Sequence, residues 1–136
     1  GTHIKDACPI VVAEPAVSGT PHAAVVSLTH CGLVHSRGPG VGAGAGAKVT
    51  IASSVFHDLA QGGECVGCTV DIADTTFANF MLRPVTKAFV DKDNDGFYFR
   101  GGQATVARSV FANMLDDCID TASSKGDPEH STLRIS

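Results

Sequence analysis

Val49-Thr-Ile51-Ala-Ser-Ser54-Val-Phe56 is the most informative segment for the fold, because three other segments of the chain repeat its pattern. The other copies are Val26-Ser-Leu28-Thr-His-Cys31-Gly-Leu33, Val70-Asp-Ile72-Ala-Asp-Thr75-Thr-Phe77 and Ala104-Thr-Val106-Ala-Arg-Ser109-Val-Phe111. Their starts are 23, 21 and 34 residues apart, so one unit is repeated and one copy carries an insertion. In each copy the first and third residues are apolar, which is typical of a short strand with one buried face.

A short strand cannot bury its apolar face alone, and no segment between the copies has the apolar spacing of a helix. We therefore expect the copies to stack in parallel, one above the next, with equivalent residues in ladders. The predicted ladders are Leu28, Ile51, Ile72 and Val106; Leu33, Phe56, Phe77 and Phe111; Val26, Val49, Val70 and Ala104; and Cys31, Ser54, Thr75 and Ser109. We interpret the phenylalanine ladder as core packing.

Further strands extend the pattern on both sides of the four copies. Cys8 and Ile10 lie 23 residues before Cys31 and Leu33, and apolar alternation resumes over 132–135. Short β-rich runs are predicted at 40–43, 66–67, 97–100 and 118–121. Each unit is then two or three strands joined by turns.

The repeated V-x-I-x-x-S-x-F unit, with Asp116-Asp117-Cys118-Ile119-Asp120, resembles the right-handed parallel β-helix superfamily of pectate lyases, polygalacturonases and related carbohydrate-active proteins. The resemblance extends over residues 24–121. It implies an all-β fold: a right-handed single-stranded parallel β-helix, a solenoid of about six coils. It also implies a polysaccharide or oligosaccharide partner and a secreted or cell-surface location. We expect one domain over 1–136, as a whole solenoid or a fragment of a longer one.

Solenoid ends need covering elements. We expect a second copy, flanking coils or terminal loops to cover them here.

The composition argues against several classes of function. The formal net charge is −4, from 10 basic and 14 acidic residues, and no basic stripe suggests a nucleic-acid partner. No apolar run approaches the length of about 18 residues that a membrane span needs. We therefore expect neither nucleic acid nor membrane as a partner.

Five cysteines permit at most two disulfides. Cys8 and Cys31 are predicted to be neighbours, as a disulfide or as two stacked thiols. Cys65-Val-Gly-Cys68 lacks the second cysteine pair of a zinc site and the following helix of a redox motif, so we interpret it as turn cysteines or a local bridge. The glycine-rich run 38–46 lacks a phosphate-loop signature, and we attribute it to tight turns and close backbone approach.

The 34-residue copy contains an inserted loop, 80–94, that carries Arg83 and Lys87. Insertions in repeat proteins often form the binding face, so this loop is the predicted rim of a site. It leads into Asp91-Lys-Asp93-Asn-Asp95-Gly96, which has the opening of a calcium loop but carries Gly102 where an EF-hand needs an acid. A simpler calcium site remains, with Asp91, Asp93, Asp95 and Asp120 as candidate ligands.

Asp95 lies 21 residues before Asp116, one repeat, so Asp95, Asp116 and Asp117 are predicted to gather on one face. Such a cluster suits general acid and base catalysis of glycoside cleavage. The segments around these residues are similar to the Asn-Thr-Asp-Gly-Phe and Asp-Asp-Cys motifs of polygalacturonases, which implies that the three aspartates are catalytic. The chain departs from that family because Asp93 and Asn94 replace the Asn-Thr pair, and no Gly-His-Gly or Arg-Ile-Lys follows.

Two hypotheses follow. The first is a carbohydrate-binding β-helix, part of a polysaccharide hydrolase or of a lyase for a uronate-type polymer, with optional calcium and with Arg83, Lys87 and Arg100 contacting substrate. The second is a noncatalytic structural or adhesive β-helix, in which the aspartates bind calcium or cap turns.

Overall fold

The computed structural model describes residues 2–5, 10–12, 24–80, 95–121 and 131–136, and these residues form strands and turns but no helix. The strands are β1 Thr2–Lys5, β2 Ile10–Val12, β3 Val25–Thr29, β4 Cys31–Ala43, β5 Lys48–Ala52, β6 Val55–Ala73, β7 Thr76–Phe80, β8 Phe97–Ala107, β9 Val110–Met114, β10 Ile119–Asp120 and β11 Ser131–Ile135. The pairings among these described strands are parallel. The expected all-β class and parallel pairing are therefore confirmed.

The copies of the repeat pair in the register that the sequence predicts. β3 pairs with β5, β5 with the end of β6, and that end with β8, so Leu28, Ile51, Ile72 and Val106 are successive partners. The ladder that starts at Leu33 continues through the three phenylalanines in the same way. β11 adds one more strand beside β8, as the resumed alternation predicts.

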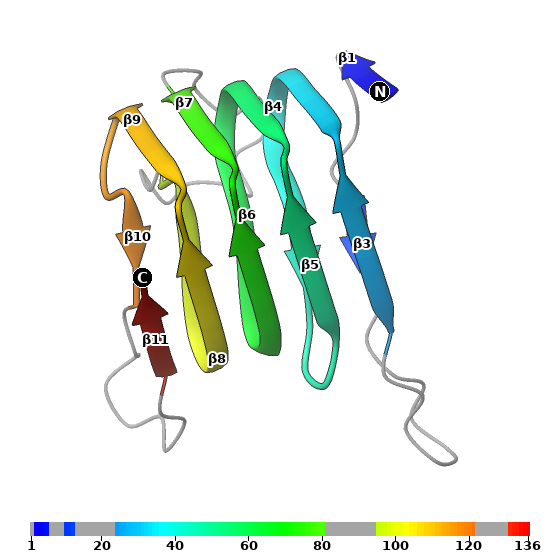
Figure 1. Ribbon diagram of the computed structural model, residues 1–136, viewed down its shortest axis with the longest axis vertical. Helices are drawn as coiled ribbons and strands as arrows, with labels where there is room; N and C mark the ends of the chain where they lie inside the picture. Colours follow the sequence, from blue (N-terminus) through cyan, green and yellow to red (C-terminus); the bar gives the residue numbers. More distant parts are fainter. Residues whose placement is uncertain (1, 6–9, 13–23, 81–94, 122–130) are drawn as a thin grey trace.

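β4, β6 and β8 are long and bent, so each contributes to more than one face of the molecule (Figure 1). One face contains β3, β5, the ends of β6 and β8, and β11. A second contains β1, the starts of β4 and β6, β7 and β9. The third contains β2, the end of β4, the middle of β6, the start of β8, and β10.

The inward side chains of these faces form one core in which phenylalanines are stacked. The rings of Phe56 and Phe77 lie 4.7 Å apart, and the Phe77 and Phe111 rings lie 4.7 Å apart and nearly parallel. Phe97 meets Phe77 edge-on from the third face. The phenylalanine ladder is core packing, as expected.

Hydroxyl side chains connect adjacent repeats at the corner between the first two faces. Ser54 Oγ accepts the Cys31 N–H, Thr75 Oγ1 accepts the Ser54 N–H, and Ser109 Oγ accepts the Thr75 N–H. Each hydroxyl also donates to the carbonyl two residues before it. The ladder thereby satisfies buried backbone groups where the chain turns away from the sheet.

Two further ladders hold the backbone in the left-handed region. His30, Ser53, Asp74 and Arg108 occupy one, with φ of 45–54°, and His35, Asp58, Asn79 and Asn113 the other, with φ of 54–60°. Six of these eight residues are Asn, Asp or His, which are enriched in this conformation.

Side-chain contacts link these corner residues across the repeats. Arg108 donates two hydrogen bonds of 2.7 Å to Asp74, and Asn113 donates to Asn79 over 2.8 Å.

The N-terminal register differs from the prediction. Cys31 and Leu33 pair with Thr2 and Ile4 of β1, whereas Ile10 pairs with Val41. The expected equivalence of Ile10 and Leu33 is therefore wrong, because β1 occupies the place beside Leu33. The predicted contact between Cys8 and Cys31 stays a prediction, since Cys8 lies outside the described residues. The Cys31 thiol is free.

Two glycines in the third face, Gly40 and Gly62, stand where no side chain fits. A Cβ on Gly62 would collide with the Gly96 carbonyl oxygen and lie 2.8 Å from the Phe80 ring. On Gly40 it would lie 2.6 Å from the Gly62 carbonyl oxygen. At Gly42, two residues farther along β4, it would meet nothing within 4 Å. Close backbone approach, the cause proposed from sequence, is confirmed for Gly40 but not for Gly42.

We expect Gly62→Ala to lower the free energy of unfolding by about 1–3 kcal/mol, because the backbone of β8 must shift to admit the methyl group. Gly42→Ala is the matched control and should leave the stability unchanged or slightly higher. Urea denaturation followed by circular dichroism measures both. Equal stability of the two variants would contradict the packing described here.

The hydrogen bonds from Arg108 hold the pKa of Asp74 below its usual range. The ion pair therefore stabilises the fold above about pH 4, and this contribution is lost as the pH falls through the lowered pKa. We expect the melting-temperature difference between the wild type and Asp74→Asn to be small, because both side chains are largely exposed, and to vanish at low pH. A difference that grows on acidification would contradict this sign.

Candidate functional site

The candidate site lies at the start of the third face, where β8 and β10 begin. Phe97 pairs with Ile119, and Glu64 pairs with Tyr98. The residues before these strands are therefore equivalent too, and the ladder position of Asp95 is shared with Gln61 and Asp117. Backbone hydrogen bonds confirm this, since Gly62 N donates to the Asp95 carbonyl and Gly96 N to the Asp117 carbonyl.

The 21-residue spacing predicts Asp116 as the equivalent of Asp95. The register makes the partner of Asp95 Asp117, because the repeat is 22 residues long at this point. Asp116 lies one residue earlier and still belongs to the group.

The expected proximity of the three carboxylates is confirmed. Asp95, Asp116 and Asp117 each place one carboxylate oxygen within 4.8 Å of the others. Asp95 is buried, with 1% of its surface exposed, whereas Asp116 and Asp117 are exposed. The cluster therefore has one buried carboxylate and two that reach solvent.

A specific hydrogen bond organises the cluster. Asp95 Oδ1 accepts the backbone N–H of Asp117 over 3.1 Å. Gly96 permits this close arrangement, because a Cβ there would collide with the Cys118 carbonyl oxygen and lie 2.6 Å from the Phe111 ring. The geometry at Asp117 thus depends on both Asp95 and the glycine that follows it.

Carboxylates this close repel one another, and a bound cation relieves the repulsion. Calcium takes oxygen ligands at about 2.4 Å, so ligands on opposite sides of the ion are about 4.8 Å apart. The cluster has the ligand type and the spacing for one divalent cation. The exposed carboxylates also have the chemistry for proton exchange with a bound molecule.

The other predicted site residues are distributed differently. Asp120 is half-buried in β10 beside Tyr98 and is not in the three-carboxylate group. Arg100 is half-buried in β8 opposite Val66. Four candidates fall outside the described residues: Arg83, Lys87, Asp91 and Asp93. Most of the inserted loop, 81–94, lies outside them as well.

Two further residues of this face are not among the site residues that the sequence predicts. Tyr98 alternates with the buried Phe97 and Phe99 and therefore points outward. This signal was present in the sequence. Glu64 faces outward in β6, but its position opposite Tyr98 needs the register, because the turn lengths between strands vary.

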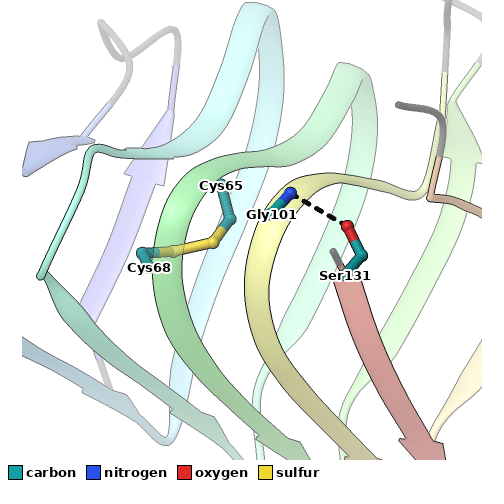
Figure 2. Close-up of a disulfide and its surroundings, with 4 residues drawn as sticks. All are labelled: Cys65, Cys68, Gly101 and Ser131. Carbon is teal, nitrogen blue, oxygen red and sulfur yellow. Dashed lines mark hydrogen bonds between the residues drawn. A yellow bond between two sulfur atoms is a disulfide. The ribbon is translucent and has the colours of Figure 1, made fainter. Parts of the chain in front are cut away.

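The Cys65–Cys68 pair forms a disulfide within β6 (Figure 2). The interpretation as a local bridge is confirmed. Both cysteines are buried, and the bridge fastens the part of β6 directly after Glu64. In Figure 2, Gly101 of β8 lies beside this segment and donates its N–H to Ser131 Oγ over 2.9 Å.

Comparison with protein-family models, with curated proteins and with solved structures finds no match to this chain. Within the part of the chain that the structure describes, no helix has the length and apolar character to cross a membrane.

Proposed function

We propose that this chain is a right-handed parallel β-helix that binds carbohydrate, with Asp95, Asp116 and Asp117 as its acidic site. Parallel pairing of equivalent residues one repeat apart supports the β-helix. The observation that carries the function is the convergence of three carboxylates just before β8 and β10, with the outward-facing Tyr98 and Arg100 farther along β8. Carboxylates and aromatic rings together suit ligands that are rich in hydroxyl groups and C–H faces.

The exposure of the three carboxylates suggests different roles. Asp116 and Asp117 are exposed and are the groups we assign to direct contact with a glycosidic linkage, one donating a proton and the other accepting one. Asp95 is buried and bonds to the Asp117 backbone, so we assign it a positioning role. Arg100, on the outer face of β8, is the described cationic residue nearest in sequence to Asp95, and we assign it to substrate contact.

A second candidate function is a structural β-helix without enzymatic activity. One observation favours it: the Asp95 carboxylate accepts the Asp117 N–H, as a turn cap would. In this reading the exposed aspartates hold calcium and stabilise the end of the domain. The disulfide supports an extracellular setting for either function, since disulfides persist in oxidising compartments.

If the site cleaves glycosidic bonds, incubation with a polysaccharide should release reducing ends, and lyase cleavage of a uronan should add absorbance near 235 nm. Asp117→Asn should reduce the rate at least about 100-fold, because general acid or base catalysis contributes factors of this size. Asp71→Asn, on the outer face of β6 away from the site, is the matched control. Polygalacturonate, alginate, xylan and mannan are the substrates to compare.

No product from any of the four polymers would leave the binding function without catalysis. Equal activity of the wild type and Asp117→Asn would contradict the assigned role of Asp117.

If the cluster holds a cation, millimolar calcium should raise the melting temperature relative to chelator, because a ligand that binds the folded form stabilises it. Asp116→Asn and Asp117→Asn should each reduce the shift. Asp71→Asn should retain it. A shift that persists in both cluster variants would place the ion elsewhere, and no shift in the wild type would contradict the calcium site.

A further inference from the structure

We infer that the outer side of the third face carries a saccharide-binding strip, formed by Gly42, Glu64, Tyr98 and Asp120, that takes neutral rather than acidic sugar units. These four residues occupy one ladder position. Gly42 pairs with Glu64, Glu64 with Tyr98, and Tyr98 with Asp120. The inference rests on the proposed carbohydrate binding and adds the place and the class of sugar.

The strip faces outward because its neighbours along each strand face inward. Phe97 and Phe99 on either side of Tyr98 are 0% and 2% exposed. Gly63 and Cys65 on either side of Glu64 are buried as well. Side chains alternate along a strand, so Tyr98 and Glu64 project from the opposite side, where both are partly exposed.

The arrangement places one carboxylate on each side of an aromatic ring. Neighbouring strands are about 4.8 Å apart, so Glu64 and Asp120 flank Tyr98 at distances similar to the width of a sugar ring. The electron-rich face of a phenol attracts the C–H groups of a pyranose. Carboxylates beside it accept strong hydrogen bonds from the sugar's hydroxyl groups.

Gly42 forms the end of the strip opposite Asp120, and it contributes no side chain there. A Cβ added there would meet nothing within 4 Å, so the space above it is open. A flat strip of this kind suits an extended polymer, since sites for small molecules are concave. We place the saccharide across the strands, from Asp120 over Tyr98 and Glu64 to Gly42.

The charge of this face selects against an acidic sugar. Glu64 and Asp120 flank the ring, and Asp116 and Asp117 lie at the adjacent corner. Arg100 is the only lysine or arginine in β6, β8 and β10. A carboxylated sugar would therefore meet mainly like charge, whereas a neutral one meets hydrogen-bond acceptors.

The strip is also held rigidly, as a binding surface requires. The Cys65–Cys68 disulfide fastens β6 immediately after Glu64, and the stacked Phe97 and Phe99 rings, 4.7 Å apart, support β8 beneath Tyr98. The backbone pairing fixes the spacing between Glu64 and Tyr98. Little conformational entropy is then lost on binding.

The test is calorimetric titration of the full chain with xylohexaose, cellohexaose, mannohexaose and hexagalacturonate. We expect at least one neutral hexasaccharide to bind about tenfold more tightly than hexagalacturonate. Tyr98→Ala should weaken that binding about tenfold, and Tyr98→Phe should largely retain it, because stacking needs the ring and not the hydroxyl. Melting curves verify that the variants fold.

Gly42→Leu is the most specific test of the binding path. It adds a side chain to open space and should block the saccharide at this end of the strip without disturbing the core. We expect it to weaken binding at least about tenfold at unchanged melting temperature. Ser27→Leu, at an exposed outward position of β3, is the matched control and should bind normally.

Three results would overturn the inference alone: neutral binding that survives both Tyr98→Ala and Gly42→Leu, loss of binding in Ser27→Leu equal to that in Gly42→Leu, or tighter binding of hexagalacturonate. Absence of binding by all four hexasaccharides would overturn the inference together with the proposed carbohydrate binding.

Discussion

The parallel register between repeats limits which side chain can stand at each position of this molecule. Each residue has its equivalent from the next repeat as its neighbour, about 4.8 Å away, so a ladder must accept the same kind of side chain at every step. Phenylalanines stack, the Ser109 and Thr75 hydroxyls accept the backbone N–H groups of Thr75 and Ser54, and glycines stand where the backbones approach. A residue that breaks its ladder therefore affects two neighbours in addition to its own strand.

The same constraint explains which parts of the fold were predictable. The inward ladders through Ile51 and Phe56 could be predicted from the alternation of apolar and polar residues and from the repeated unit. Both patterns indicate which side of a strand is buried. The N-terminal register and the partner of Asp95 did not follow. Turn lengths vary between repeats, and one residue of difference moves the equivalent of Asp95 from Asp116 to Asp117. The sequence spacing between repeats does not show how many residues belong to each turn. Only the strand pairing shows this.

The acidic site is a ladder position whose chemistry changes along the molecule. Gln61 is buried and uncharged at this position, Asp95 is buried and acidic, and Asp117 is acidic and exposed. The sequence predicted the cluster because two acidic segments stand about one repeat apart. It did not predict the burial of Asp95, which results from Gly96 and the close approach of the next strand. Burial separates the residue that positions Asp117 from the two that reach solvent.

The direction of a bound saccharide relates the acidic site to the outer strip. Tyr98 lies three residues beyond Asp95 along the chain, about 10 Å at the rise of a strand. A polymer that crosses the strands over Gly42 and Tyr98 remains at about this distance from the corner, too far for Asp117 to reach a linkage. A polymer that follows β8 passes from Arg100 over Tyr98 to the carboxylates. The open space at Gly42 favours the crossing path for the proposed binding at the strip, whereas the proposed cleavage by Asp116 and Asp117 requires the path along β8.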